Sequence, residues 1–251
     1  MNYHSDALGH GVSVNVIIPE KRKTLIGMGG ESAEKYKTVY LLHGLSDDET
    51  IWMRRTSIER YATELGVAVV MPNGGRSWYT DTASGEAYFT FIAKELPELA
   101  RSFFSGLSDK REDNIIAGLS MGGYGAIKAA LRCPETFGAC ISLSGALDIS
   151  RLDYLMKPSE WRGIFGFDMR STAETSGTDE DVFHLARVAK VFPRLYMWCG
   201  TEDALLEMNR RFSAQLTELG VSHKYEESEG SHTWKFWDLH IKDGIEYAIS
   251  N

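Results

Sequence analysis

Residues 114–126 read Asn114-Ile115-Ile116-Ala117-Gly118-Leu119-Ser120-Met121-Gly122-Gly123-Tyr124-Gly125-Ala126. The apolar run before Gly118 predicts a short buried strand, and the apolar residues after Ser120 recur at helical spacing. A Gly-x-Ser-x-Gly pattern between a strand and a helix is typical of a sharp turn that leaves the serine side chain exposed. Gly118 and Gly122 omit the Cβ atoms that would clash in so tight a turn. The alternative is a glycine-rich turn whose serine only caps the helix.

Strands and helices alternate along the rest of the chain. Apolar runs predict strands at 12–18, 38–42, 67–71, 115–117, 138–143, 194–199 and 222–227. Helical spacing predicts helices at 51–65, 86–104, 121–131, 205–219 and 234–248, with a break or kink at Pro97. The first strand is expected to be antiparallel and near an edge, and Gly66 is expected to end the first helix. This rhythm predicts an α/β fold with a mainly parallel sheet and helices on both faces.

The strand–helix rhythm lapses between residues 150 and 191. This segment mixes polar residues with apolar ones, namely Tyr154, Leu155, Met156, Trp161, Ile164, Phe165, Phe167 and Met169. Long irregular segments are usually functional, so these side chains are expected either to line a substrate pocket or to pack the segment onto the body. Because the chain has no repeat or linker, we expect a single domain over 1–251, with a short cap-like insertion at about 150–191.

The serine of the Gly-x-Ser-x-Gly pattern needs partners to react. A serine hydroxyl is a poor nucleophile unless a histidine takes its proton and a carboxylate orients that histidine. In α/β-hydrolases the order along the chain is Ser, then Asp or Glu, then His. Of the seven histidines, only His232 is predicted on a loop between the last strand and the last helix, although a structural role is its alternative. The others are expected before the sheet (His4, His10), in another motif (His43), in the insertion (His184), in a strand (His223) or inside a helix (His240).

The carboxylate is expected to be Asp203, which follows the strand at 194–199 and precedes His232 by 29 residues. Its alternative role is the N-cap of the next helix, which aspartate fills well. Glu202 is the neighbouring competitor. Asp148 also follows a strand, but one position earlier in the sheet.

Two backbone N–H groups are expected to bind the oxyanion that forms when the serine attacks a carbonyl. One is the N–H of Met121, directly after Ser120, and the other belongs to a loop after an earlier strand. His43-Gly44-Leu45 is that loop, with Leu45 as the expected donor, because Gly44 lets the backbone approach closely. The alternative for this sequence is an ordinary turn.

Composition limits the partners and the compartment. The 251 residues carry a formal net charge of −8, which argues against a nucleic-acid or membrane partner. Cys133, Cys140 and Cys199 lie far apart in apolar settings, so we expect buried thiols in a reducing compartment. The N-terminus lacks the regions of a signal peptide, and no apolar run reaches the roughly 20 residues that cross a bilayer. We therefore expect a cytoplasmic protein. No His and carboxylate cluster has metal-ligand spacing, so neither a metal nor another cofactor is expected.

Four motifs together resemble a known family. They are Leu41-Leu42-His43-Gly44-Leu45, Asn73-Gly74-Gly75-Arg76-Ser77, Gly118-Leu119-Ser120-Met121-Gly122-Gly123-Tyr124-Gly125 and Gly230-Ser231-His232-Thr233-Trp234. The combination resembles the bacterial tributyrin-esterase group, in the esterase D branch of the α/β-hydrolases, over roughly residues 13–247. The resemblance implies an α/β-hydrolase fold, a triad of Ser120, Asp203 and His232, and oxyanion donors at Leu45 and Met121.

The resemblance also implies a serine carboxylesterase that hydrolyses short-chain acyl esters, from acetyl to butyryl, through an acyl-enzyme. Its partner is a small-molecule ester, and members of the group are often homo-oligomers. Related enzymes deacetylate carbohydrates or release hydroxycinnamates such as ferulate, and these remain alternatives. A thioesterase like the S-formylglutathione hydrolases is a further alternative, although those enzymes typically have His where this chain has Leu119. A scaffold protein that keeps the fold without catalysis is the rival from another class.

Overall fold

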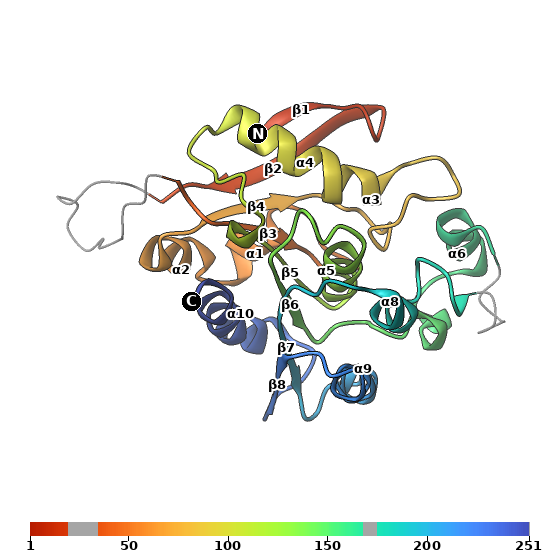
Figure 1. Cartoon of the computed structure of the whole chain (residues 1–251). Coiled ribbons are helices and arrows are strands. Elements are labelled where there is room, and N and C mark those ends of the chain that lie inside the picture. The colour runs from red at the N-terminus through yellow and green to blue at the C-terminus, as the bar shows by residue number, and fades with distance from the viewer. Residues whose placement is uncertain (20–34, 168–174, 251) are drawn as a thin grey trace.

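The computed structural model describes residues 1–19, 35–167 and 175–250. An eight-stranded sheet runs through this part of the chain, with helices packed on both of its faces (Figure 1). The three cysteines are buried and form no disulfide. None of the described helices is long and apolar enough to cross a membrane.

The sheet is parallel over six of its strands. Its strands are β1 (Asn2–Ser5), β2 (His10–Ile17), β3 (Thr38–Leu42), β4 (Ala68–Pro72), β5 (Asn114–Leu119), β6 (Ala139–Leu143), β7 (Arg194–Gly200) and β8 (His223–Ser228). Their order across the sheet is β1-β2-β4-β3-β5-β6-β7-β8. The β1–β2 and β2–β4 pairs are antiparallel, and every other pair is parallel. The predicted mainly parallel α/β architecture is confirmed.

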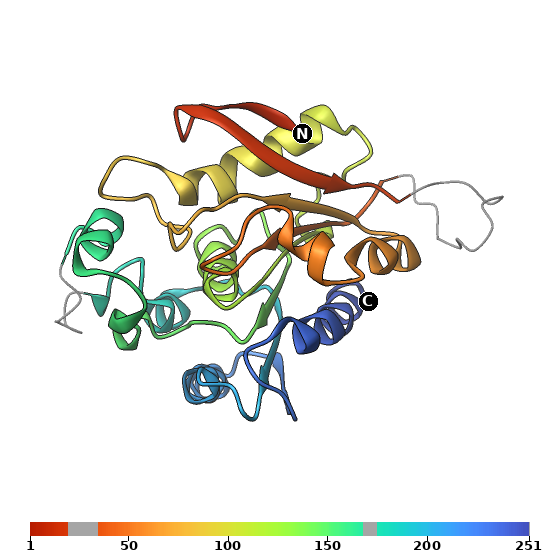
Figure 2. The same cartoon turned by 180° about the vertical axis from the view of Figure 1, so that it is seen from behind.

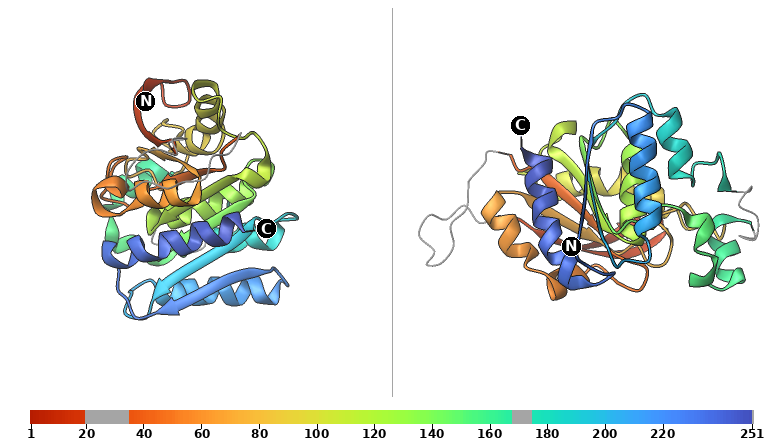
Figure 3. Two further views of the ribbon diagram at one scale, coloured as in Figure 1. Left: turned by 90° about the vertical axis from the view of Figure 1, so that its left-hand side faces the viewer. Right: turned by 90° about the horizontal axis from the view of Figure 1, so that it is seen from below.

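Helices cover both faces of the sheet, as the buried strands require. The helices outside the 150–191 segment are α1 (Ile51–Arg55), α2 (Ile58–Leu65), α3 (Tyr88–Thr90), α4 (Leu96–Phe103), α5 (Met121–Arg132), α9 (Leu206–Glu218) and α10 (Trp234–Ile249). One apolar core contains side chains from α1, α2 and α10, and the other contains side chains from α4, α5 and α9. Figures 2 and 3 show α10 and α9 on opposite sides of the sheet. Because β3, β4 and β5 are buried along their whole length, they read as continuous apolar runs.

Two predicted helices are less regular than their periodicity suggested. The helix predicted at 51–65 is divided into α1 and α2, because the N–H of Ser57 donates to the carboxylate of Asp238 at 2.8 Å rather than continuing the helix. Gly66 ends α2 in the left-handed conformation, as predicted. The helix predicted at 86–104 contains a π-helical stretch, Phe91–Glu95, which ends two residues before Pro97. This stretch is the irregularity that Pro97 predicted, since proline has no N–H for the helix.

The N-terminus extends the sheet further than the sequence indicated. His4 lies in β1 and His10 begins β2, so the expectation that both precede the sheet is wrong. The strand predicted at 12–18 is β2, which is antiparallel as predicted, but β1 forms the edge beyond it. Few apolar residues alternate in Asn2–Ser5, so periodicity does not identify this strand.

The segment between β6 and β7 contains short helices, among them η3 (Ile149–Arg151), η4 (Asp153–Leu155), α6 (Pro158–Phe165) and α8 (Val182–Val188). Trp161, Phe165 and Met156 are buried and pack with Trp78, whose indole lies 5.9 Å from that of Trp161. These three side chains therefore pack the segment onto the body of the protein, which was one of the two predicted alternatives. Tyr154 and Leu155 are exposed, and Met169 lies outside the described residues.

Candidate active site

Ser120 stands at a strained turn between β5 and α5. Its backbone has φ 53° and ψ −117°, a conformation that few non-glycine residues adopt. A Cβ on Gly118 would collide with the backbone of Gly122, and a Cβ on Gly122 would lie 2.6 Å from the carbonyl oxygen of Leu42. The two glycines of the Gly-x-Ser-x-Gly pattern are therefore needed for the close crossing of β5, α5 and β3. The turn leaves the Ser120 side chain partly exposed at the carboxyl edge of the sheet.

The structure brings Ser120, His232 and Asp203 together. The Oγ of Ser120 lies 3.0 Å from Nε2 of His232. On the other side of the ring, Nδ1 lies 2.9 Å and 3.1 Å from the two carboxylate oxygens of Asp203. Since an ionised carboxylate only accepts hydrogen bonds, Nδ1–H donates to Asp203 and Nε2 accepts the hydroxyl proton of Ser120.

Asp203 is buried, whereas His232 is about one-third exposed. Burial on its own raises the pKa of Asp203, but hydrogen bonds from His232 and from the N–H of Leu205 outweigh it, so the pKa lies below its usual value. Asp203 is thus ionised at neutral pH. Glu202 is exposed, and within the described part of the chain the imidazole hydrogen-bonds to Asp203 rather than to Glu202. Asp148 pairs with arginines instead.

Trp237 packs against the histidine, and Ser144 holds Trp237; sequence reasoning missed both roles. The Trp237 ring is perpendicular to the His232 ring, with centroids 4.8 Å apart, and its indole N–H donates to the hydroxyl of Ser144. Ser144 follows β6 with φ 47°. The periodicity of α10 predicts that Trp237 is buried, but its contact with the imidazole depends on how the last loop folds back.

The loop after β3 lies beside Ser120, because a Cβ on Gly44 would be in van der Waals contact with the Cβ of Ser120, at 4.0 Å. The same Cβ would lie only 2.9 Å from Cδ1 of Leu119, so this approach favours glycine at position 44. Among contacts with described residues, neither the N–H of Leu45 nor that of Met121 donates to another group of the protein. Two backbone donors without an internal partner are thus available beside the Ser120 turn.

His43 holds this loop in place. Its Nε2 accepts the N–H of Gly74 at 2.8 Å, so Nδ1 carries the proton and donates to the carbonyl of Gly44 at 2.7 Å. The hydroxyl of Tyr79 donates to the His43 carbonyl at 2.9 Å. Burial lowers the pKa of His43, which keeps the imidazole neutral. The sequence predicted that His43 lies in this loop, but it did not predict the hydrogen bond from the N–H of Gly74.

A buried ion pair fastens the 150–191 segment to α5. The Nζ of Lys128 is fully buried and lies 2.7 Å from a carboxylate oxygen of Glu180, which also accepts hydrogen bonds from Thr80 and Tyr124. Lys128 also donates to the hydroxyl of Thr80 at 2.7 Å. Lys128 lies on the same stripe of α5 as Tyr124, four residues earlier, which is a sequence signal for a buried lysine. Its partner, 52 positions away in an irregular segment, has no such signal.

This arrangement has a definite chemical capacity. A buried carboxylate fixes the tautomer of an imidazole, and that imidazole can take the proton of a serine hydroxyl as the serine attacks a carbonyl carbon. Backbone N–H donors beside the serine can stabilise the oxyanion that results. Hydrolysis by this route needs no metal or organic cofactor.

Comparison with known proteins agrees with hydrolysis by a reactive serine. A family model described as "Putative esterase" matches residues 5–246. An acetyl esterase from Caldicellulosiruptor saccharolyticus is 33% identical over 260 residues, covering 98% of this chain and 96% of the relative.

Solved structures give the same result. FphF, a fluorophosphonate-binding serine hydrolase from Staphylococcus aureus, has a TM-score of 0.88 and 36% identity, covering 100% of this chain and 97% of its own. An S-formylglutathione hydrolase (FrmB) from the same organism has a TM-score of 0.86 and 36% identity, with the same coverage. The sheet order and these likenesses establish the α/β-hydrolase fold. The chain therefore belongs to the esterase family and is a carboxylic ester hydrolase.

Proposed function

We propose that Ser120 is the nucleophile of this esterase, His232 its general base and acid, and Asp203 the carboxylate that orients the imidazole. The observation that supports these roles is the continuous chain of hydrogen bonds from Ser120 through His232 to buried Asp203. The strained backbone at Ser120 supports the same assignment, because strain of this kind concentrates at functional sites.

Hydrolysis then proceeds in two steps. The Oγ of Ser120 bonds to the carbonyl carbon of the ester while its proton moves to Nε2 of His232. The imidazolium protonates the leaving alcohol as the carbon–oxygen bond breaks, which leaves an acyl-enzyme on Ser120. A water molecule then attacks the acyl carbon and gives a proton to His232. As the bond between that carbon and Oγ breaks, His232 returns the proton to Ser120 and the acid is released.

We also propose that the N–H groups of Leu45 and Met121 bind the oxyanion in both steps. Their support is the placement of Gly44 against Ser120 and the absence of an internal acceptor for either N–H among the described residues. His43 would act on this pair as a positioning residue, because it fixes the carbonyl of Gly44 next to Leu45.

The substrate class we propose is short-chain acyl esters, from acetyl to butyryl, as in the tributyrin-esterase group. The similarity to an acetyl esterase supports the short acyl chain. A panel of p-nitrophenyl acetate, butyrate and octanoate, with a feruloyl ester beside them, tests this: kcat/KM should be highest for acetate or butyrate. Highest kcat/KM for the octanoate or feruloyl ester would contradict the proposal.

A second candidate is thioester hydrolysis, because FrmB of Staphylococcus aureus, with a closely similar structure, is an S-formylglutathione hydrolase. Leu119 stands where S-formylglutathione hydrolases typically have His, and this difference favours the ester over the thioester. A direct comparison of an acetyl thioester with p-nitrophenyl acetate separates the two candidates.

We also propose that the chain forms one domain over residues 1–251, lies in the cytoplasm and assembles with identical chains. The buried, unpaired cysteines are consistent with a reducing compartment.

The roles are tested by Ser120→Ala. We expect hydrolysis of p-nitrophenyl acetate to fall by at least about a thousandfold, because no other group can form the acyl-enzyme. Ser102→Ala removes an exposed hydroxyl elsewhere and is the matched control, with wild-type activity expected. Full activity in Ser120→Ala would refute the assignment.

A further inference from the structure

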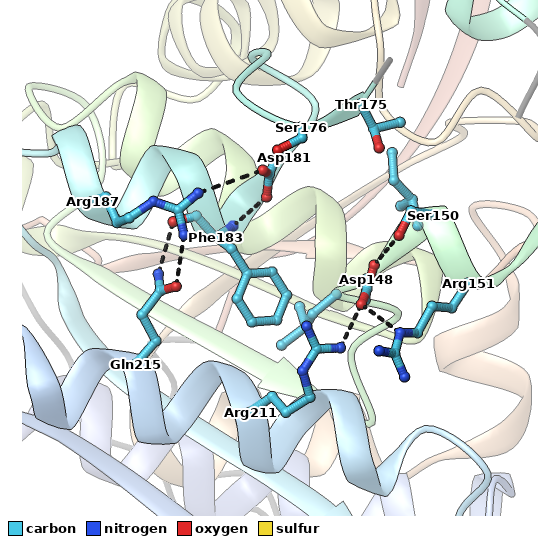
Figure 4. Close-up of a pocket in the computed structure, with 12 residues that line it drawn as sticks. Asp148, Ser150, Arg151, Thr175, Ser176, Asp181, Phe183, Arg187, Arg211 and Gln215 are labelled. Atoms are coloured by element: carbon cyan, nitrogen blue, oxygen red, sulfur yellow. Dashed lines mark hydrogen bonds and ion pairs between the residues drawn. The ribbon is translucent and has the colours of Figure 1, made fainter. Parts of the chain in front are cut away.

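A polar pocket of about 570 Å³ lies between the segment after β6, the region of α8, and α9 (Figure 4). Neither Ser120, His232 nor Asp203 is among its described lining residues, so it is distinct from the triad. Three of these lining residues are arginines, Arg151, Arg187 and Arg211, which come from three separate elements of the chain.

The pocket is close to the nucleophile. The N–H of Ala146 donates to the backbone carbonyl of Ser120 at 3.0 Å, and Asp148, in the pocket, is only two residues further along. Two extended residues reach about 7 Å, so the backbone of Asp148 lies within about 12 Å of Ser120. From the other side, Asn209 donates to the carbonyl of Gly145 at 2.9 Å. The Asp148 end of the pocket is thus close in space to the backbone of Ser120.

Asp148 gathers two of the arginines at one end of the pocket. Its Oδ2 accepts a hydrogen bond from Nη1 of Arg211 at 2.6 Å and lies 3.1 Å from Nε of Arg151 in an ion pair, while its Oδ1 accepts a hydrogen bond from the hydroxyl of Ser150. The Asp148 side chain is 12% exposed, whereas those of Arg211 and Arg151 are 39% and 61% exposed. The carboxylate is therefore the buried anchor and the guanidinium groups are the accessible surface. Figure 4 shows them on two sides of Asp148.

The third arginine lies across the pocket. Arg187 donates to the side-chain oxygen of Gln215 at 2.9 Å and lies 3.8 Å from a carboxylate oxygen of Asp181. The described lining residues thus include three arginines and two aspartates, which gives the pocket one surplus positive charge. This surplus stands out in a chain with a net charge of −8. A pocket with surplus positive charge attracts anions.

We propose that this pocket is a subsite for a carboxylate carried by the substrate, which Arg211 and Arg151 bind while the ester or thioester lies at Ser120. The inference rests on the proposed function of Ser120. A guanidinium has five N–H donors, and the hydrogen bond to Asp148 uses one N–H of Arg211, while Arg151 is held beside Asp148 by an ion pair. Each can therefore offer further donors to a second carboxylate in the paired geometry that arginine favours.

The carboxylate could stand on either half of the ester, so the experiment has two arms. In the acyl arm, mono-p-nitrophenyl esters of glutaric to suberic acid are compared with matched esters in which a carboxamide replaces the free carboxylate. In the alcohol arm, 3-acetoxybenzoate is compared with 3-acetoxybenzamide. Each pair differs by one charge at nearly constant shape. We expect kcat/KM to favour the carboxylate by about tenfold in one arm, which identifies the half that carries the anion.

Arg211→Gln and Arg151→Gln should each reduce this preference severalfold, because glutamine can still bond to Asp148 but carries no charge. Arg210→Gln is the matched control. Arg210 is the neighbour of Arg211 on α9, but its guanidinium pairs with Glu227 on β8. It should leave both activity and preference unchanged. If Arg211→Gln fails to fold, Arg151→Gln on its more exposed turn carries the test.

Raising the salt concentration should weaken the preference, since the guanidinium groups are partly exposed and are screened by ions. Equal kcat/KM within both pairs, or a preference that survives both arginine variants, would overturn the subsite. Failure of the wild type to hydrolyse p-nitrophenyl acetate, which carries no carboxylate, would instead refute the proposed function itself.

Discussion

The Nε2 atom of His232 lies 3.0 Å from the Oγ atom of Ser120, although the two residues are 112 positions apart in the chain. They meet because β5 and β8 end at the same edge of a parallel sheet, and the loops that follow both strands fold over that edge. Asp203 reaches the other side of the imidazole from the loop after β7, the strand next to β8. The topology of the sheet therefore assembles the site.

Asp203→Asn should lower kcat by about a thousandfold to ten-thousandfold, because an amide N–H facing Nδ1 favours the tautomer that cannot accept the proton of Ser120. Steady-state hydrolysis of p-nitrophenyl acetate gives the value. Glu202→Gln, at the exposed neighbouring position, is the control and should keep wild-type kcat. An equal loss in both variants would mean that charge near the loop matters and that Asp203 has no specific role.

Gly122→Ala should destabilise the protein by about 1–3 kcal/mol, because the added methyl group would lie 2.6 Å from the Leu42 carbonyl and 2.7 Å from that of His43. Gly163→Ala in α6 is the matched control, since no atom lies within 4 Å of its added Cβ, and it should be neutral or slightly stabilising. Urea unfolding of both variants gives the free energies. Equal stability of the two would contradict the close crossing at Ser120.

His43 should make the protein less stable in mild acid. Burial lowers its pKa below the ordinary value of 6.5, so just below pH 6.5 the unfolded chain binds a proton that the folded chain does not. The free energy of unfolding therefore falls as the pH falls through this window. His43→Gln should lose part of this pH dependence. Unfolding measured at several pH values tests it, with exposed His10→Gln as control; an unchanged dependence in His43→Gln would refute the explanation.

Removing one member of the buried Lys128–Glu180 pair should cost about 3–5 kcal/mol, because it leaves the other charge buried without its partner. Lys128→Met and Glu180→Gln are the single variants, and the double variant should recover a large part of the loss. The exposed pair of Lys224 and Glu226 is the control and should contribute less than about 1 kcal/mol. Urea unfolding in a double-mutant cycle measures both couplings, and similar values for the two would contradict this account.

The central strands and the reactive residues could be predicted from the sequence for the same physical reason. Strands buried on both faces, such as β3, read as unbroken apolar runs, and parallel strands end at one edge, so Ser120, Asp203 and His232 could be expected together. Asp203 is preferred to Asp148 because it follows the strand at 194–199, one position later in the sheet than the strand before Asp148.

Features that depend on tertiary contacts could not be predicted. The break between α1 and α2 depends on a hydrogen bond from the N–H of Ser57 to the carboxylate of Asp238, which lies 181 positions away in the chain. The partner of Lys128 lies in a segment without periodicity, and β1 has too few apolar residues to be recognised. The first two of these features are set by long-range contacts that local propensity does not contain, whereas β1 pairs with its neighbour β2 across a short turn.

The most direct test of the central claim is covalent labelling followed by mass measurement of the intact protein. Treatment with a fluorophosphonate should add one phosphonyl group per chain, and peptide mapping should place it on Ser120, in parallel with complete loss of esterase activity. Ser120→Ala should remain unlabelled, and Ser102→Ala should label like the wild type. Labelling of Ser120→Ala, or loss of activity with the modification at another residue, would contradict the assignment of Ser120 as the nucleophile.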